Sequence, residues 1–307
     1  MSAALRVKPE DFFDSDEWGA LSKRSSFRGI LLVLHCWLVI AAAMVMGVLW
    51  PITIPLAVML IGTRQLGLFI LMHDAAHGLL HPNRKINDWL ALWFCGNELT
   101  AYRPYHLQHH RFVQQSEDPD LVLSAPFPIT RDSLRRKIIR DLTGQTFVKQ
   151  RFGVLKDQFK DRKPGESAWA LIVTEARRQR EFLICNGLGL AIFSALGLWW
   201  AWVLMWLLPM ATWLPLVTRL RNIGEHALIA QNGTDPLRHA RTIHASPLAR
   251  VLIAPYWVNY HCEHHMFTQI PCWNLASAHR MLERKGVTPR MEVQPGYMAV
   301  LKLASGR

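Results

Sequence analysis

Two long stretches almost without charged side chains constrain the fold of this 307-residue chain more than any other feature. The first runs from Gly29 to Met72 and contains one arginine, and the second runs from Phe182 to Thr218 and contains no charge. Their lengths are 44 and 37 residues. About 20 helical residues cross a bilayer, so we expect each stretch to form a hairpin that crosses the membrane twice.

The expected turns and the charges around them predict an orientation. Pro51 and Pro55 interrupt the first stretch, because proline breaks a helix. Trp199, Trp200 and Trp202 lie near the middle of the second stretch, and tryptophan is typical of a membrane interface. Both turns lack Lys and Arg, whereas the remaining segments are basic. The positive-inside rule therefore places those segments in the cytosol.

The predicted architecture is an all-α membrane protein with four transmembrane helices in two hairpins and a cytosolic helical cap. Its parts form one integrated domain: 1–28 cytosolic, 29–72 hairpin, 73–181 cytosolic, 182–218 hairpin and 219–307 cytosolic. A bacterial inner membrane or the endoplasmic reticulum fits this multi-pass arrangement. The net charge of +12 comes without an aromatic-interleaved nucleic-acid module, so anionic lipid is the expected partner and nucleic acid is not.

The cysteines argue against several cofactors. The five cysteines are odd in number and form no CxxC pair. Disulfide scaffolds, iron–sulfur clusters and thiolate zinc sites all need paired or closely spaced cysteines. We therefore expect these residues to be reduced.

Nine of the fourteen histidines fall into four short groups, all on the predicted cytosolic side. Helix positions i, i+3 and i+4 share a face, so HxxxH and HxxHH each direct two or three imidazoles toward one point. Nine imidazoles exceed the coordination number of one ion, which predicts two metals. Imidazole suits Zn, Cu, Fe and Ni, so the ligand type leaves the metal open. The nine are His73, His77, His106, His109, His110, His226, His261, His264 and His265.

Four further residues stand inside or beside these groups. Asp74, Glu225 and Glu263 are expected either to orient imidazoles through hydrogen bonds or to be ordinary acids on a helix surface. Asn222 lies four residues before His226. It is expected either to hold a metal-bound water or to cap a helix.

The four groups resemble those of the membrane fatty acid desaturase and hydroxylase superfamily, the integral-membrane histidine-box di-iron enzymes that include carotenoid ketolases and alkane hydroxylases. The motifs are HDAAH from residue 73, HLQHH from 106, NIGEH from 222 and NYHCEHHMFTQIP from 259. The resemblance implies two irons held by the nine histidines, with Asn222 near one of them through water. The chain departs from the family pattern in three ways: its first box is HxxxH, Thr268 stands where relatives often carry proline, and it has no cytochrome b5 motif.

The resemblance implies O2-dependent oxidation of an unactivated C–H bond in a lipid acyl chain, and we expect desaturation. The alternatives are a lipid or alkane hydroxylase or a carotenoid ketolase of the same superfamily. From another class, a non-catalytic metal-binding or metal-transport membrane protein is also open. Desaturation and hydroxylation share their first hydrogen abstraction, so the box residues do not separate them.

The electrons that O2 chemistry needs are expected from another protein of the ferredoxin, rubredoxin or cytochrome b5 type. Residues 131–181 contain 14 Lys or Arg against 7 acids and predict a cationic amphipathic helix. This region is expected either to bind anionic lipid or to dock an acidic donor. The candidate docking residues are Arg135, Arg136, Lys137, Arg140 and Lys149.

Arg64 is unusual because it lies within the first apolar stretch. A charged side chain at such a depth costs about 2.5 to 3.5 kcal/mol on insertion scales. Either its side chain snorkels to the interface or it has a buried partner such as Glu98. The histidines outside the four groups are expected to be ordinary surface or interfacial residues: His35, His81, His239, His244 and His279.

Overall fold

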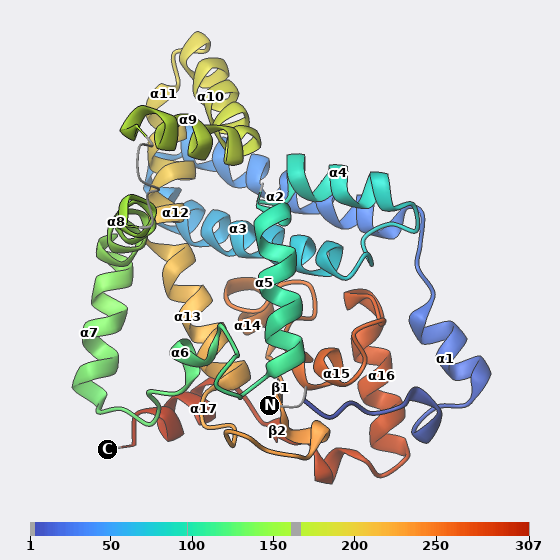
Figure 1. The fold of residues 1–307 in the computed structure, drawn as a ribbon. Helices are drawn as coiled ribbons and strands as arrows, with labels where there is room; N and C mark the ends of the chain where they lie inside the picture. The colour runs from blue at the N-terminus through green and yellow to red at the C-terminus, as the bar shows by residue number, and fades with distance from the viewer. Residues whose placement is uncertain (1–3, 97, 161–166, 307) are drawn as a thin grey trace.

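The computed structural model describes residues 4–96, 98–160 and 167–306, and it is mostly helical. Figure 1 shows α2 and α3 side by side, with the later box-bearing helices below them. The elements of the first half are η1 (Pro9–Asp11), α1 (Ser15–Ser22), α2 (Arg28–Leu49), η2 (Pro51–Thr53), α3 (Ile54–Ala76), α4 (Arg84–Phe94), α5 (Leu99–Phe112), α6 (Leu121–Ser124), α7 (Arg131–Leu142) and α8 (Gln145–Lys160).

The second half contains shorter elements. They are α9 (Ala168–Arg178), α10 (Arg180–Ala195), α11 (Trp199–Trp202), a π-helical segment η3 (Val203–Leu207), α12 (Leu208–Ala211), α13 (Trp213–His226), η4 (Pro236–Arg238), β1 (Arg241–Ile243), α14 (Pro247–Leu252), α15 (His261–Met266), α16 (Cys272–Arg284), η5 (Thr288–Arg290), β2 (Glu292–Gln294) and α17 (Tyr297–Ala304).

In the described part of the chain, three helical stretches are long and apolar enough to cross a membrane: Arg28–Leu49, Pro51–Ala76 and Trp199–His226. The first two are joined by the expected proline-containing turn and pack along each other. In the second apolar run, Gly197 adopts a positive φ of 72° between α10 and α11, so the chain turns beside the tryptophans as expected. The fourth expected span falls on α10, which has 16 residues, and its crossing stays a prediction.

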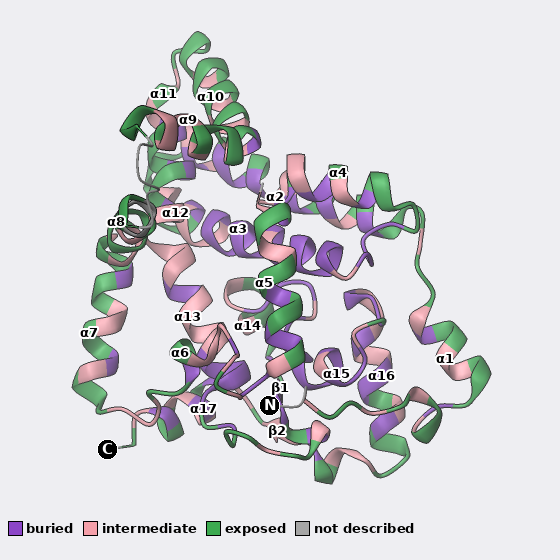
Figure 2. Ribbon diagram, viewed as in Figure 1, coloured by how far each residue is buried: buried purple, intermediate pink, exposed green. Residues whose placement is uncertain are grey.

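α3 is the central helix of the molecule. From Ile61 to Ala76 almost every residue is buried, whereas α2 exposes one apolar face (Figure 2). The helices α2, α4, α5 and α13 all pack against α3. Because such a helix is enclosed on all sides, the side chains at its end are held in fixed positions.

Arg64 has a buried partner, which was one of the two expectations, but that partner is not Glu98. Its side chain is 8% exposed, so it does not snorkel, and one terminal nitrogen donates to the carbonyl of Val251 at 3.0 Å. Its guanidinium also lies over the ring of Tyr256. Glu98 instead pairs with Arg151 at 3.8 Å. The α14 region therefore supplies the partner of Arg64.

The all-α prediction is wrong in one detail. β1 and β2 form a parallel pair with Arg241 opposite Glu292. Three-residue strands leave no alternation in the sequence to detect, because pairing over so short a length is fixed by the surrounding structure. This ladder ties the segment before α15 to the chain beyond η5.

Gly224 allows three elements to meet close to His226. A Cβ atom at this position would lie 2.7 Å from the Ile243 side chain and 2.8 Å from the Tyr297 ring. Only glycine permits that approach. α13, β1 and α17 are thereby held together at the end of α13.

Candidate metal centre

Four elements deliver the nine histidines to one place. His73 lies in the last turn of α3 and His77 directly follows that helix. α5 presents three imidazoles at i, i+3 and i+4, and α15 presents three more in the same spacing. His226 is the last residue of α13. Seven of the nine side chains are buried, and His77 and His265 are half-buried.

The nine imidazoles divide into two groups, within each of which the candidate ligand atoms all lie within 4.8 Å of one another. The five-histidine group consists of His73, His77, His106, His110 and His264. The four-histidine group consists of His109, His226, His261 and His265. Among the residues that the structure describes, no other His, Cys, Asp or Glu belongs to either group.

The distances between ring nitrogens fit metal coordination. In the five-histidine group, Nε2 of His106 lies 2.9 Å from Nε2 of both His77 and His110. In the four-histidine group, Nε2 of His261 lies 2.9 Å from that of His226 and 3.1 Å from that of His265. Two nitrogens bound at about 2.1 Å and at a right angle are about 3.0 Å apart. The observed spacing of the ring nitrogens is therefore that expected of ligands bound to one shared ion.

The protonation state also suits metal binding. Burial lowers the pKa of His77 to about 3. It lowers the pKa values of His106 and His264 well below the ordinary value, with neighbouring histidines adding to the effect. Both ring nitrogens of His73 lack a hydrogen-bond partner among the described residues. Neutral imidazole is the form that binds metals, so the pocket keeps these rings ready for ligation.

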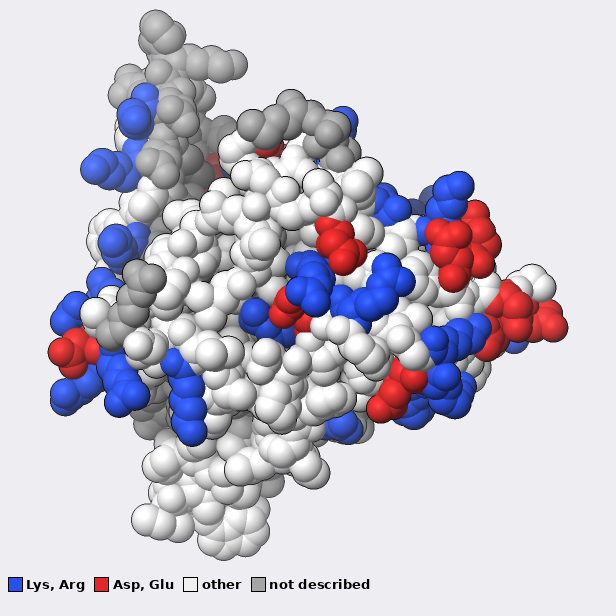
Figure 3. Space-filling model, turned by 90° about the horizontal axis from the view of Figure 1, so that it is seen from below, with Lys and Arg blue, Asp and Glu red and all other residues white. Residues whose placement is uncertain are grey.

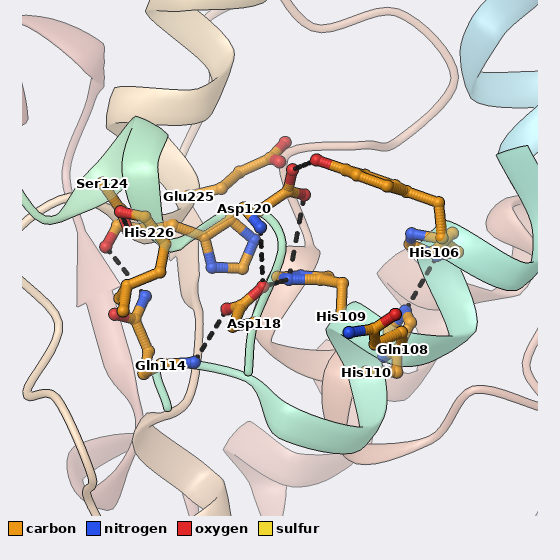
Figure 4. Close-up of polar contacts among 12 residues, drawn as sticks. His106, Gln108, His109, His110, Gln114, Asp118, Asp120, Ser124, Glu225 and His226 are labelled. Atoms are coloured by element: carbon orange, nitrogen blue, oxygen red, sulfur yellow. Dashed lines mark hydrogen bonds and ion pairs between the residues drawn. The ribbon is translucent and has the colours of Figure 1, made fainter. Parts of the chain in front are cut away.

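Of the described carboxylates, Asp118 makes the shortest contact with a histidine of the two groups, although it stands outside all four histidine motifs. Its Oδ1 lies 2.8 Å from Nδ1 of His109, and its other oxygen accepts from the backbone N–H of Gln114 at 2.9 Å (Figure 4). An acceptor on Nδ1 leaves Nε2 of His109 free for a metal. The signal for this contact in the sequence is the Asp-Pro-Asp turn, which begins nine residues after His109.

The three expected carboxylates have different partners. Asp74 lies 3.7 Å from Nδ1 of His73 and accepts from the backbone N–H of Cys272 at 2.8 Å. Glu225 lies 3.4 Å from Nε2 of His261 and accepts from Arg221. Neither is an exposed surface acid, because both are buried.

Glu263 contacts no imidazole of the two groups in the described structure. It accepts from Nδ1 of His279 at 2.5 Å and from the hydroxyl of Thr242. It points away from the cluster because it lies on the other face of α15 from the three histidines. His279 is therefore not a surface residue, and the carboxylate of Glu263 raises its pKa against the opposing effect of burial.

Of the other histidines outside the groups, two differ from expectation and two agree with it. His81 and His239 are buried, with polar contacts to the backbone of Asn83 and Gly233 respectively. His35 is exposed, as predicted, and contacts the hydroxyl of Tyr256. His244 is exposed, as predicted.

A cavity of about 470 Å³ adjoins the cluster and is lined mainly by apolar and aromatic side chains. Met72, Tyr102 and Asn222 line the end beside the histidines. The Tyr102 ring stacks on the ring of His106, with centroids 5.2 Å apart. Asn222 lies inside α13 and therefore does not cap it. The cavity therefore comes next to the histidine groups through these residues, although none of the nine histidines lines it.

Comparisons with known proteins agree with these features. The model of the fatty acid desaturase family matches residues 48–291. The dihydrorhizobitoxine desaturase of Bradyrhizobium elkanii is 28% identical over 262 residues, which cover 80% of this chain and 70% of that protein. The beta-carotene ketolase of Paracoccus sp. (strain N81106 / MBIC 01143) is 27% identical over 69% of this chain and 74% of its own length. The beta-carotene ketolase of Paracoccus sp. (strain PC1) is 26% identical over 79% of this chain and 87% of its own length.

These relatives are oxidoreductases. The chain belongs to the fatty acid desaturase family.

Proposed function

We propose that this protein binds two irons and uses O2 to oxidise an unactivated C–H bond of a lipid acyl chain, by desaturation. The observation that carries the proposal is the division of nine imidazoles into two ligand groups beside an apolar cavity. The family and the relatives support oxidoreductase chemistry.

The chain's own residues have defined parts in this proposal. The nine histidines would hold the irons, and bound iron would supply the O2 activation that side chains lack. Asp118 orients His109 through Nδ1. Met72 and the apolar cavity wall position a hydrocarbon chain and keep bulk water away from it. Asn222 is positioned to hold a water at the boundary between cavity and cluster.

Ketolation or hydroxylation is the alternative supported by a specific observation, because two of the relatives are beta-carotene ketolases. Oxygen insertion and desaturation begin with the same hydrogen removal. The products separate them, because desaturation removes two hydrogens and oxygen insertion adds 16 Da per oxygen atom.

Metal analysis and lipid profiling together test the proposal. Purified protein should contain about two Fe per chain, as the two ligand groups require. Mass spectrometry of total lipids with and without expression should show new unsaturated acyl chains. Bound zinc with an unchanged lipid profile would instead support a non-catalytic metal-binding or metal-transport protein, and oxygenated carotenoids would support the ketolase.

We further propose that the enzyme is an integral membrane protein with a cytosolic active site. Reporter fusions at Ala20, Ile52, Asp120, Ala201 and Arg290 test this topology. Only the fusions at Ile52 and Ala201 should report a non-cytosolic location. A cytosolic reporter at Ala201 would mean that α10 does not cross.

A separate electron donor is also part of the proposal. Desaturation with reduction of O2 to two waters takes two electrons from the substrate and two from a donor. Lys and Arg gather at the left edge of Figure 3, on the side where Figure 1 draws α7. Arg135, Arg136 and Arg140 of α7 are exposed, whereas Lys137 lines the cavity. The three exposed arginines and Lys149 therefore fit a docking face better than Lys137 does.

Charge reversal tests the donor face. The triple change of Arg135, Arg136 and Arg140 to Glu should slow reduction by a soluble acidic donor, and added salt should slow the wild type similarly. If reduction is unchanged while membrane association falls, the arginines bind lipid instead.

A further inference from the structure

The cavity beside the histidine groups is lined by exposed residues in one part and by buried residues in another, which we call its open and closed ends. Val122 and Arg151, which are exposed residues of α6 and α8, line the open end. At the closed end Gln65 is only 3% exposed, and aromatic residues line the wall around it. Gln65 is therefore a buried amide in the middle of an apolar helix.

The orientation of the Gln65 amide is fixed by its neighbour. Its Nε2 donates to the backbone carbonyl of Trp206 at 2.8 Å. A carbonyl only accepts, so the amide nitrogen must face Trp206. Oε1 of Gln65 is left without a hydrogen-bond partner among the described residues.

Trp206 is itself held in place. Its ring nitrogen donates to Oδ1 of Asn186 at 2.8 Å, and its ring stacks on those of Trp37 and Trp202. It lies in the π-helical segment Val203–Leu207, and such segments are frequent at functional sites. Oε1 of Gln65 is thus a buried acceptor without a partner among the described residues, on a residue that lines the cavity beside this rigid wall.

We propose that the substrate carries an O–H or N–H donor at the end that enters the closed part, and that Oε1 of Gln65 accepts from it. A buried acceptor without a partner is unfavourable, and polar residues inside membrane helices commonly mark substrate sites. This inference rests on the proposed function, because it assumes that a chain oxidised at the histidine groups occupies the cavity. It adds Gln65 as the residue that selects among such chains.

The position of Gln65 limits the distance between the donor and the oxidised carbon. Gln65 precedes His73 by eight residues on α3, or about 12 Å along the helix axis. A C–C bond of about 1.5 Å advances an extended chain by about 1.25 Å. The donor should thus lie on the order of ten bonds from the oxidised carbon.

Matched pairs of linear acids test the inference. Each pair has the same chain, of about 10 to 18 carbons to span the cavity volume, with either a methyl or a hydroxyl at the far end. The iron-loaded wild type should bind the hydroxyl member about tenfold or more tightly at one length, measured by quenching of tryptophan fluorescence. Its kcat/KM should rise in the same ratio.

Two substitutions distinguish the hydrogen bond accepted by Gln65 from any effect that a Gln-to-Leu change has elsewhere in the protein. Gln65→Leu should remove the hydroxyl preference, whereas Gln145→Leu, at an exposed position outside the cavity, should keep it. Equal binding of both members at every length by the wild type would overturn the inference even if Gln65→Leu did not fold. That result leaves the proposed oxidation standing. Hydroxyl-dependent binding without oxidation of either member would keep the inference and overturn the proposed function.

Discussion

The five-histidine and four-histidine groups share a construction but differ in their carboxylates. In the five-histidine group, the nearest carboxylate is Asp74, at 3.7 Å from Nδ1 of His73. The four-histidine group has Asp118 at 2.8 Å from His109 and Glu225 at 3.4 Å from His261. The five-histidine group therefore offers five imidazoles, whereas the four-histidine group offers one imidazole fewer and has two carboxylates close by. This difference predicts that the two groups respond differently to substitution.

Removal of a histidine should have the largest effect, and it tests whether both groups are needed. His73→Ala in one group and His226→Ala in the other should each abolish turnover, because an undercoordinated ion is lost or misplaced. Turnover by purified protein is the measurement. His35→Ala and His244→Ala are the controls and should keep activity. Full activity in His226→Ala alone would show that the four-histidine group is dispensable.

Acid should destabilise the metal-free protein, because burial lowers the pKa values of histidines in both groups. The folded-state pKa of His77 is about 3, below the ordinary value of 6.5. The unfolded chain therefore binds more protons below pH 6.5, and folding stability falls as pH falls. At pH 5 His77 alone would cost about 2 kcal/mol. Thermal unfolding of metal-free protein in detergent should shift to lower temperature between pH 7 and pH 5, and His77→Gln should reduce that shift.

Substitution of Asp118 should affect the four-histidine group alone. Asp118→Asn removes the charge beside His109 and should weaken metal binding about 10- to 100-fold. Iron content should fall from about two toward one per chain, as expected if the groups bind independently. Asp132→Asn, at an exposed position on α7, is the matched control. Equal loss of both irons would mean that the groups do not act separately.

Asn222→Ala should have the smallest effect. The residue lines the cavity and would act on a metal through water, so we expect less than about a tenfold loss of kcat/KM. Iron content should remain at the wild-type value. Loss of iron from this variant would show that Asn222 contributes directly to the metal site.

The clustering of the histidines could be predicted because it depends on local geometry. The i, i+3, i+4 spacing places imidazoles on one face of any helix, and the structure brings all nine together. The contact between Asp118 and His109 could not be predicted in the same way. It depends on how the chain turns after α5, and a turn signal does not say which side chain it faces.

The ends of the apolar helices were harder to predict for an electrostatic reason. The second apolar run ends at Thr218 in the sequence, but its helix continues to His226. Arg219 pairs with Asp141, and Arg221 pairs with Glu225. A hydropathy scale counts each charged residue but takes no account of whether that charge is paired in the fold. Arg64 shows the same effect, because its partner is a backbone carbonyl that carries no signal in the sequence.

The contact of Tyr297 with Gly224 has a consequence for where the folding unit ends. The segment shared with the family stops at residue 291, yet β2 and α17 follow it and pack against β1 and α13. A protein shortened to the shared segment would lose the ring that covers Gly224, two residues from His226. The segment matched by the family and the packed structure therefore end at different places in this chain, and the tail beyond residue 291 belongs to the structure that holds His226.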